Sequence, residues 1–158
     1  MEYDDREKAA RVWQRVRKQG DAAAEQPPSV EQNTQGLLAL ITQEWEAAVV
    51  YQQLLRQFSG QEAVLLRKLF EQKHAHAARL KGIYVLMTGQ RPVIRSAPPT
   101  REPAQTVLRR CYGAELRRLQ QYEERSGHPE YGEIFAGLAA AQRNHCSWIL
   151  ELLGSLDG

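Results

Sequence analysis

Proline and glycine divide this sequence into long segments that only helices can fill. Apolar residues recur every three to four positions, without a proline, over residues 34–58 and again over 59–87. Two further proline-free segments cover residues 104–125 and 130–153, on either side of a Gly-His-Pro turn at 127–129. Nothing alternates at period two, so no strand is expected. The sequence therefore predicts an all-α protein with four long helices.

Two proline-containing segments set the organisation of the chain. Residues 89–103 hold four prolines, and they can extend to roughly 45–50 Å, which is long enough to run the length of a bundle as a crossover. Residues 21–33 include Pro27 and Pro28, and they follow a short amphipathic helix predicted at 4–19. We expect two parts: an N-terminal helix and linker at 1–33, and a four-helix bundle at 34–155.

Composition excludes several classes of partner. The chain has 158 residues and a formal net charge of +2, which is too small to indicate nucleic acid or a membrane surface as a partner. No apolar run approaches the ~20 residues of a membrane span, and the N-terminus lacks the apolar core of a secretory signal. We therefore expect a cytoplasmic protein. The two cysteines, Cys111 and Cys146, form no C-x-x-C motif, so a four-cysteine metal centre is excluded.

The helical segments contain an internal repeat with an offset of 71 residues. Without any gap, the repeat pairs Glu44 with Glu115, Tyr51 with Tyr122, Glu62 with Glu133, and His74 with His145. A repeat that keeps Glu, Tyr and His at fixed offsets is far less expected by chance than a single E-x-x-H. The first helix of each pair thus carries a glutamate and a tyrosine, and the second helix carries a histidine.

The spacing predicts that these side chains meet. Glu44 and Glu71 are 27 residues apart, with their midpoint at the turn near residue 58, so an antiparallel hairpin carries both to one level. Glu71 and His74 are three residues apart and share a helix face. Glu115 and Gln142 have the same 27-residue separation around the second turn. Each hairpin therefore offers one carboxylate and one x-x-His segment at a common level.

This arrangement resembles the ferritin-like superfamily and, more narrowly, rubrerythrin-like proteins. The resemblance covers residues 34–155 and implies an antiparallel four-helix bundle with a long crossover between its second and third helices. It also implies an iron site of one or two ions, although another divalent metal could occupy such ligands. The implied metal ligands are Glu44, Glu71, His74, Glu115 and His145, and Tyr51 and Tyr122 match tyrosines that hydrogen-bond the carboxylates.

Two residues depart from that pattern. Gln142 occupies the position where the family has a metal-bridging glutamate. Two divalent iron ions would carry a charge of +4, and three carboxylates rather than four would be present to balance it. Arg118 lies three residues after Glu115, where the first hairpin has Ala47, and it could pair with the carboxylates in place of a metal. Our hypothesis is that Gln142 and Arg118 mark a site with reduced or lost metal binding.

Two functions follow as hypotheses, and whether the protein is an enzyme stays open. The first is a rubrerythrin-like iron protein that reduces peroxide or oxygen with an impaired site. It would need an external electron donor, because the chain has no four-cysteine iron domain. The alternative is a metal-free ferritin-like scaffold that acts through protein–protein interaction. The N-terminal helix with Trp13 would then be a contact element, docking on its own bundle or on a second subunit of a homodimer.

Overall fold

The computed structural model describes residues 30–95, 98 and 101–156. The expected helix at 4–19 and its Trp13 lie outside these residues. The described part is all-α, as the sequence predicts, and it contains no strand. Its four helices are α2 (Val30–Leu55), α3 (Gly60–Thr88), α4 (Ala104–Arg125) and α5 (Gly132–Leu156).

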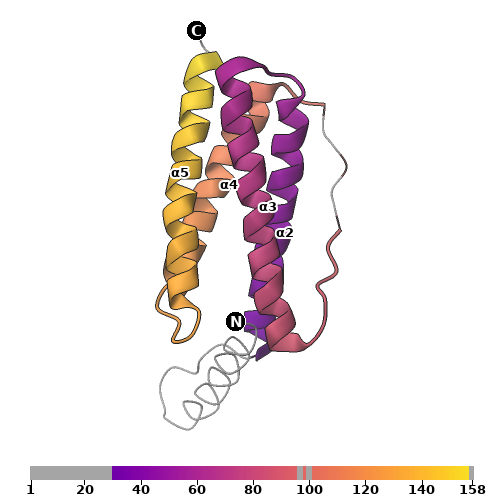
Figure 1. Ribbon diagram of the computed structural model, residues 1–158, viewed down its shortest axis with the longest axis vertical. Helices are drawn as coiled ribbons and strands as arrows, with labels where there is room; N and C mark the ends of the chain where they lie inside the picture. The colour runs from indigo at the N-terminus through magenta and orange to yellow at the C-terminus, as the bar shows by residue number, and fades with distance from the viewer. Residues whose placement is uncertain (1–29, 96–97, 99–100, 157–158) are drawn as a thin grey trace.

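The four helices form two antiparallel hairpins, which pack side by side as a bundle (Figure 1). The first hairpin joins α2 to α3, and the second joins α4 to α5. Helix α3 ends at the end of the bundle where α2 begins, whereas α4 begins at the opposite end (Figure 1). The connection between α3 and α4 therefore runs along the length of the bundle, as the proline-rich segment at 89–103 indicates.

The turns of the two hairpins differ in length. Residues 56–59 join α2 to α3, whereas residues 126–131 join α4 to α5. The sequence places the start of α5 near residue 130, but the helix begins at Gly132. The His128 ring Nδ1 accepts the backbone N–H groups of Glu130 and Tyr131 at 3.2 Å each, which holds these residues in the turn. Gly132 is required there, because a Cβ would lie 2.3 Å from the carbonyl oxygen of Ser126.

The interior consists of two apolar clusters that lie toward opposite ends of the bundle, with polar side chains between them. Both clusters draw on all four helices, as expected for helices with an apolar stripe. The first cluster contains Leu37, Leu40, Ile41, Leu80, Ile83, Tyr122, Tyr131, Phe135, Leu138 and Ala139. The second contains Ala47, Tyr51, Leu54, Leu65, Leu66, Leu69, Val107, Leu108, Ile149 and Leu152.

The four helices also bear on membrane insertion. Within the described residues, none combines the length and apolar character needed to cross a bilayer.

Candidate functional site

A polar layer interrupts the apolar interior halfway along the bundle. Its residues are at most 4% exposed, and all four helices contribute to it. We define the polar layer as Glu44, Lys73, Glu115, Arg118, Gln142 and His145. Buried charges are stable only when they are paired and hydrogen-bonded, so the contacts within this layer decide its chemistry.

Lys73 lies at the centre of the polar layer and is fully buried. Its Nζ lies 2.5 Å from Oε2 of Glu115 and 3.3 Å from Oε1 of Glu44. It also donates a hydrogen bond to Oε1 of Gln142 at 2.7 Å. An ammonium group has three N–H donors, and here it meets three oxygen atoms from three other helices. Lys73 therefore places a positive charge between the two carboxylates.

Arg118 provides the second positive charge of the polar layer. Its Nη2 donates to Oε1 of Glu115 at 2.5 Å, and its Nε lies 3.7 Å from Oε1 of Glu44. Two carboxylates thus face one ammonium and one guanidinium, so the four charges sum to zero. Gln142 adds no charge: its Nε2 donates to the side chain and to the backbone carbonyl of Glu115.

The two tyrosines cross between the hairpins. Tyr51 of the first hairpin donates to Oε1 of Glu115 at 2.9 Å, and Tyr122 of the second donates to Oε1 of Glu44 at 2.7 Å. Burial raises the pKa of both phenols well above the ordinary value, and the neighbouring glutamates raise it further. Both phenols therefore remain protonated and act as hydrogen-bond donors. These are the carboxylate contacts that the family resemblance implies for Tyr51 and Tyr122.

The ionic partners set the protonation of the acids and bases. Burial alone would raise the pKa of Glu44, but Lys73, His76 and Arg118 together outweigh it and hold that pKa well below the usual value. Burial alone would lower the pKa of Arg118, but Glu115 and Glu44 outweigh it and raise that pKa. Glu44 and Arg118 are therefore both ionised at neutral pH.

A histidine pair borders the polar layer. The rings of His76 and His145 have centroids 5.2 Å apart, and Nδ1 of His76 lies 3.6 Å from Oε2 of Glu44. Nε2 of His145 lies 2.6 Å from the side-chain oxygen of Gln72. Burial and, to a smaller extent, the nearby Lys73 together lower the pKa of His145 to about 2. Three buried atoms here have no hydrogen-bond partner: Glu44 Oε2, His76 Nδ1 and His145 Nδ1.

The predicted ligands separate into two groups. The structure brings Glu44, Glu115 and His145 together, with Gln142 and Arg118 beside them. Glu71 and His74, in contrast, are exposed, and the His74 ring lies against Trp45 and Phe70 at centroid distances of 5.9 and 6.0 Å. The reason is helical geometry: Glu71 and Lys73 are two residues apart, which is a rotation of about 200°. The face expected to point inward therefore points to solvent.

The 27-residue spacing holds for the second hairpin but not for the first. Glu115 contacts Gln142, 27 residues later, whereas Glu44 contacts Lys73, 29 residues later. Consequently the buried x-x-His segment of α3 begins at Lys73 and ends at His76. Its equivalent in α5 is Gln142 to His145, at an offset of 69 rather than 71 residues.

Sequence reasoning missed Lys73 and His76, although a signal for Lys73 exists. The buried stripe of α3 consists of Leu65, Leu66, Leu69, Lys73, Ala77, Leu80 and Ile83. Lys73 lies in the middle of this stripe at helical spacing, four residues from its apolar neighbours on each side. A lysine within an apolar stripe must find buried anions, and Glu44 and Glu115 were already expected at that level.

The donor set of the polar layer does not fit a two-iron centre. Among the residues that the structure describes, no group of three or more His, Cys, Asp or Glu side chains is arranged to hold a metal ion. Iron in such bundles is held by carboxylates that bridge and neutralise it. Here the charges of both buried carboxylates are already balanced by Lys73 and Arg118.

The fold and the polar layer together define the class of this protein: an all-α four-helix bundle with a buried ionic network between its two hairpins. No protein-family profile, curated protein or solved structure matches the chain.

Proposed function

We propose that this protein is a metal-independent helical bundle of ferritin-like ancestry, and that it acts by binding other molecules rather than as an iron enzyme. One observation carries the proposal: Nζ of Lys73 lies between Glu115 Oε2, Glu44 Oε1 and Gln142 Oε1 at 2.5–3.3 Å. An ammonium group there takes the role that a bound cation would have. It also cannot ligate a metal while it is protonated.

The charge of the polar layer supports this function. Two carboxylates, one ammonium and one guanidinium are neutral together, and each charge has a partner within the bundle. A divalent cation placed among them would leave about two uncompensated positive charges in a buried environment, which is costly. The network instead serves to hold the two hairpins in one register, because each carboxylate contacts groups on both hairpins.

The pattern of residues supports ferritin-like ancestry. Each hairpin presents a glutamate on its first helix and an x-x-His segment on its second, namely Lys73 to His76 and Gln142 to His145. Ferritin-like di-iron proteins place a glutamate at the first position of both segments. Replacement of one by lysine and of the other by glutamine would convert a metal centre into a hydrogen-bonded ionic network.

A second candidate is a rubrerythrin-like iron protein with a single ion, and one observation favours it. Glu44 Oε2, His76 Nδ1 and His145 Nδ1 are buried without a partner, and they carry the ligand types that iron or zinc accepts. This candidate would use His76 in place of the expected His74, and it needs these side chains to converge further. A reductase built on it would also require an external electron donor.

Anaerobic titration with Fe(II) separates the two candidates. The full chain is loaded, excess metal is removed, and bound iron per chain is measured by elemental analysis. We expect no saturable binding to the wild-type protein. The double variant Lys73→Glu with Gln142→Glu serves as the positive control, because it places a glutamate at the first position of both x-x-His segments.

The result that overturns the proposal is stoichiometric iron in the wild-type chain. One equivalent that is lost in His76→Gln but kept in His74→Gln would establish the second candidate. His74 is the matched control because it lies on the same helix, two residues away, and is exposed.

A further inference from the structure

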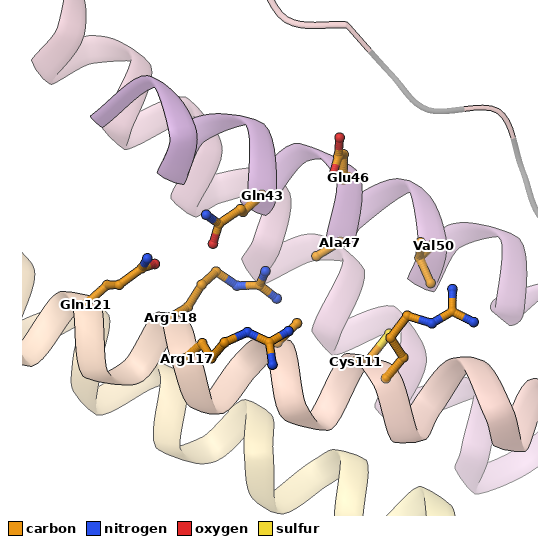
Figure 2. A pocket seen from close by; sticks show the side chains of 10 residues that line it. Gln43, Glu46, Ala47, Val50, Cys111, Arg117, Arg118 and Gln121 are labelled. Atoms are coloured by element: carbon orange, nitrogen blue, oxygen red, sulfur yellow. The ribbon is translucent and has the colours of Figure 1, made fainter. Parts of the chain in front are cut away.

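A pocket of about 390 Å³ lies between α2 and α4, on the outer side of the polar layer (Figure 2). Its size falls within the range of small-molecule sites, roughly 300–1,000 Å³. Four residues of α2 and six residues of α4 form its walls: Gln43, Glu46, Ala47 and Val50 from α2, and Arg110, Cys111, Ala114, Arg117, Arg118 and Gln121 from α4. We refer to it as the α2–α4 pocket.

Two polar atoms on the walls of the α2–α4 pocket lack partners. Nε of Arg118 is buried without a hydrogen-bond acceptor, and the Arg118 side chain is only 5% exposed. Its Nη2 is already bonded to Glu115, and its Nε lies 3.7 Å from Oε1 of Glu44, which is an ion-pair distance without a hydrogen bond. Oε1 of Gln121 is likewise buried without a donor. The two residues are three apart on α4 and therefore lie on one face. The pocket thus offers one free donor beside one free acceptor.

Arginines outnumber acids on the walls of the pocket. Arg117, Arg110 and Arg118 line the pocket against the single acid Glu46. Arg110 pairs with Glu102 and Arg118 with the polar layer, whereas Arg117 has no ion pair with any residue that the structure describes. Figure 2 shows the guanidinium group of Arg118 between α4 and α2, and that of Arg117 alongside α4. A guanidinium matches the geometry of a carboxylate with two parallel hydrogen bonds.

Small and apolar side chains supply the rest of the lining. Ala47 and Val50 come from α2, and Ala114 and Cys111 come from α4. Burial and, to a smaller extent, Glu115 together raise the pKa of the Cys111 thiol to about 11, so the thiol is neutral and behaves as a small apolar group. The short side chains leave room for a few carbon atoms next to the arginines.

We propose that the α2–α4 pocket binds a small organic acid that carries an N–H or O–H donor next to its carboxylate, such as a 2-hydroxy or 2-amino acid. The carboxylate contacts Arg117 and Nε of Arg118, the neighbouring donor contacts Oε1 of Gln121, and the carbon chain packs on Ala47 and Val50. This inference deepens the proposed binding function and rests on it, because Arg118 is held in place by the metal-free polar layer.

The test compares four probes of similar size by two-dimensional NMR titration of the full chain, with EDTA present. The probes are 2-hydroxybutyrate, 2-aminobutyrate, butyrate and butanamide. We expect saturable shifts with the acids, tighter binding of the two donor-carrying acids than of butyrate, and no binding of butanamide. Failure of all four probes to saturate would overturn the inference, as would equal binding of butanamide and butyrate.

Two variants connect any binding to the pocket. Arg117→Gln should weaken the acids about tenfold, since a charge-assisted hydrogen bond is lost. Arg109→Gln is the matched control, because Arg109 is exposed on the same helix and does not line the pocket. Gln121→Leu should remove the advantage of 2-hydroxybutyrate over butyrate. Equal effects of Arg117→Gln and Arg109→Gln would place the binding elsewhere and overturn the inference.

The two proposals fail in different ways. If no probe binds while the wild-type chain still takes up no Fe(II), the pocket inference fails and the metal-independent bundle stands. If Fe(II) binds stoichiometrically at the histidines, the metal-independent function fails whatever the probes do.

Discussion

The two hairpins carry the same glutamate, tyrosine and histidine but compensate their charge differently. In the second hairpin, Glu115 is paired by Arg118 on its own helix, three residues away. The first hairpin has Ala47 at the equivalent position, and the base that contacts Glu44 is Lys73 on α3. The difference shows that neutrality of the layer, rather than the identity of a residue at a repeat position, is what the bundle maintains.

The difference also makes the two hairpins depend on each other. Lys73 lies closer to Glu115 of the other hairpin, at 2.5 Å, than to Glu44 of its own, at 3.3 Å. Tyr51 and Tyr122 each donate to the glutamate of the opposite hairpin. The layer thus stabilises the packing of hairpin on hairpin more than it stabilises either hairpin alone.

We expect the largest effect on the folded state from the double variant Lys73→Glu with Gln142→Glu, which makes the two hairpins alike at these positions. Four buried carboxylates would then face Arg118 alone, so we expect the metal-free variant to lose its folded state, since typical stabilities are only about 5–15 kcal/mol. Fe(II) or Zn(II) should restore the helical circular-dichroism signal with cooperative thermal unfolding. The control is Lys68→Glu with Gln120→Glu, which makes the same charge change at two exposed positions. Metal-independent folding of the first variant would contradict the charge argument.

The next largest loss of stability is expected when the ammonium group of Lys73 alone is removed. Lys73→Met keeps the length of the side chain but leaves Glu44 and Glu115 without their shared base, and breaking a buried ion pair in this way costs roughly 3–5 kcal/mol. Urea unfolding measures the change against Lys68→Met, an exposed position on the same helix. A loss no larger than that of the control would mean that the layer contributes little to stability.

The tyrosines test whether the two hairpins contribute equally. Tyr51→Phe and Tyr122→Phe each remove a hydrogen bond to a buried carboxylate, worth about 1.5–3 kcal/mol. We expect similar losses in the free energy of unfolding for both. Tyr112→Phe, at a position outside the layer on α4, should change stability by less. A much larger loss in the free energy of unfolding for one of the first two variants would show that one glutamate depends more than the other on its tyrosine hydroxyl.

The smallest effect concerns pH. His145 has a folded pKa of about 2 against an ordinary value of 6.5, so it stays neutral in the fold while the unfolded chain takes up a proton below pH 6.5. Stability should therefore fall as pH drops below 6.5, by roughly 2 kcal/mol before pH 4.5. Glu44 adds to the loss only below 4.5, because its folded pKa is also lowered.

A matched pair of variants isolates the histidine. Urea unfolding at several pH values should give a flatter dependence between pH 6.5 and 4.5 for His145→Gln and no change for His74→Gln, which is exposed. An unchanged slope in His145→Gln would assign the acid sensitivity to another group.

The sequence was sufficient for the helices because their signals are local. Proline, glycine and apolar spacing predicted four helices, and the long crossover followed from 89–103, although α2 runs from Val30 to Leu55 rather than over 34–58. The start of α5 was missed by about two residues, because the His128 ring holds Glu130 and Tyr131 in the turn. That contact depends on side-chain geometry, which the residue pattern does not contain.

The site was predictable only in part. Glu44, Glu115 and His145 come together because each lies at the level that the turns dictate, whereas Glu71 and His74 share the level but not the face. The level of a side chain along the bundle depends on its distance from the turn, and an error of two residues changes this level little. The direction in which a side chain points from the helix axis, in contrast, changes by about 200° over the same two residues. The apolar stripe through Lys73 was therefore a better guide to the inward face than the E-x-x-H motif.

The crossing contacts of the polar layer also restrict the symmetry of assembly. Two copies of the first hairpin, packed as the two hairpins pack here, would bring Lys73 opposite a second Lys73, since its partner position is occupied by Gln142 in the native bundle. Two copies of the second hairpin would lack any lysine to bridge their glutamates. Domain exchange that keeps the contacts of Lys73 with Glu115 and Gln142 therefore recreates one first hairpin against one second hairpin. The pseudo-twofold arrangement relies on contacts that two identical halves would not reproduce.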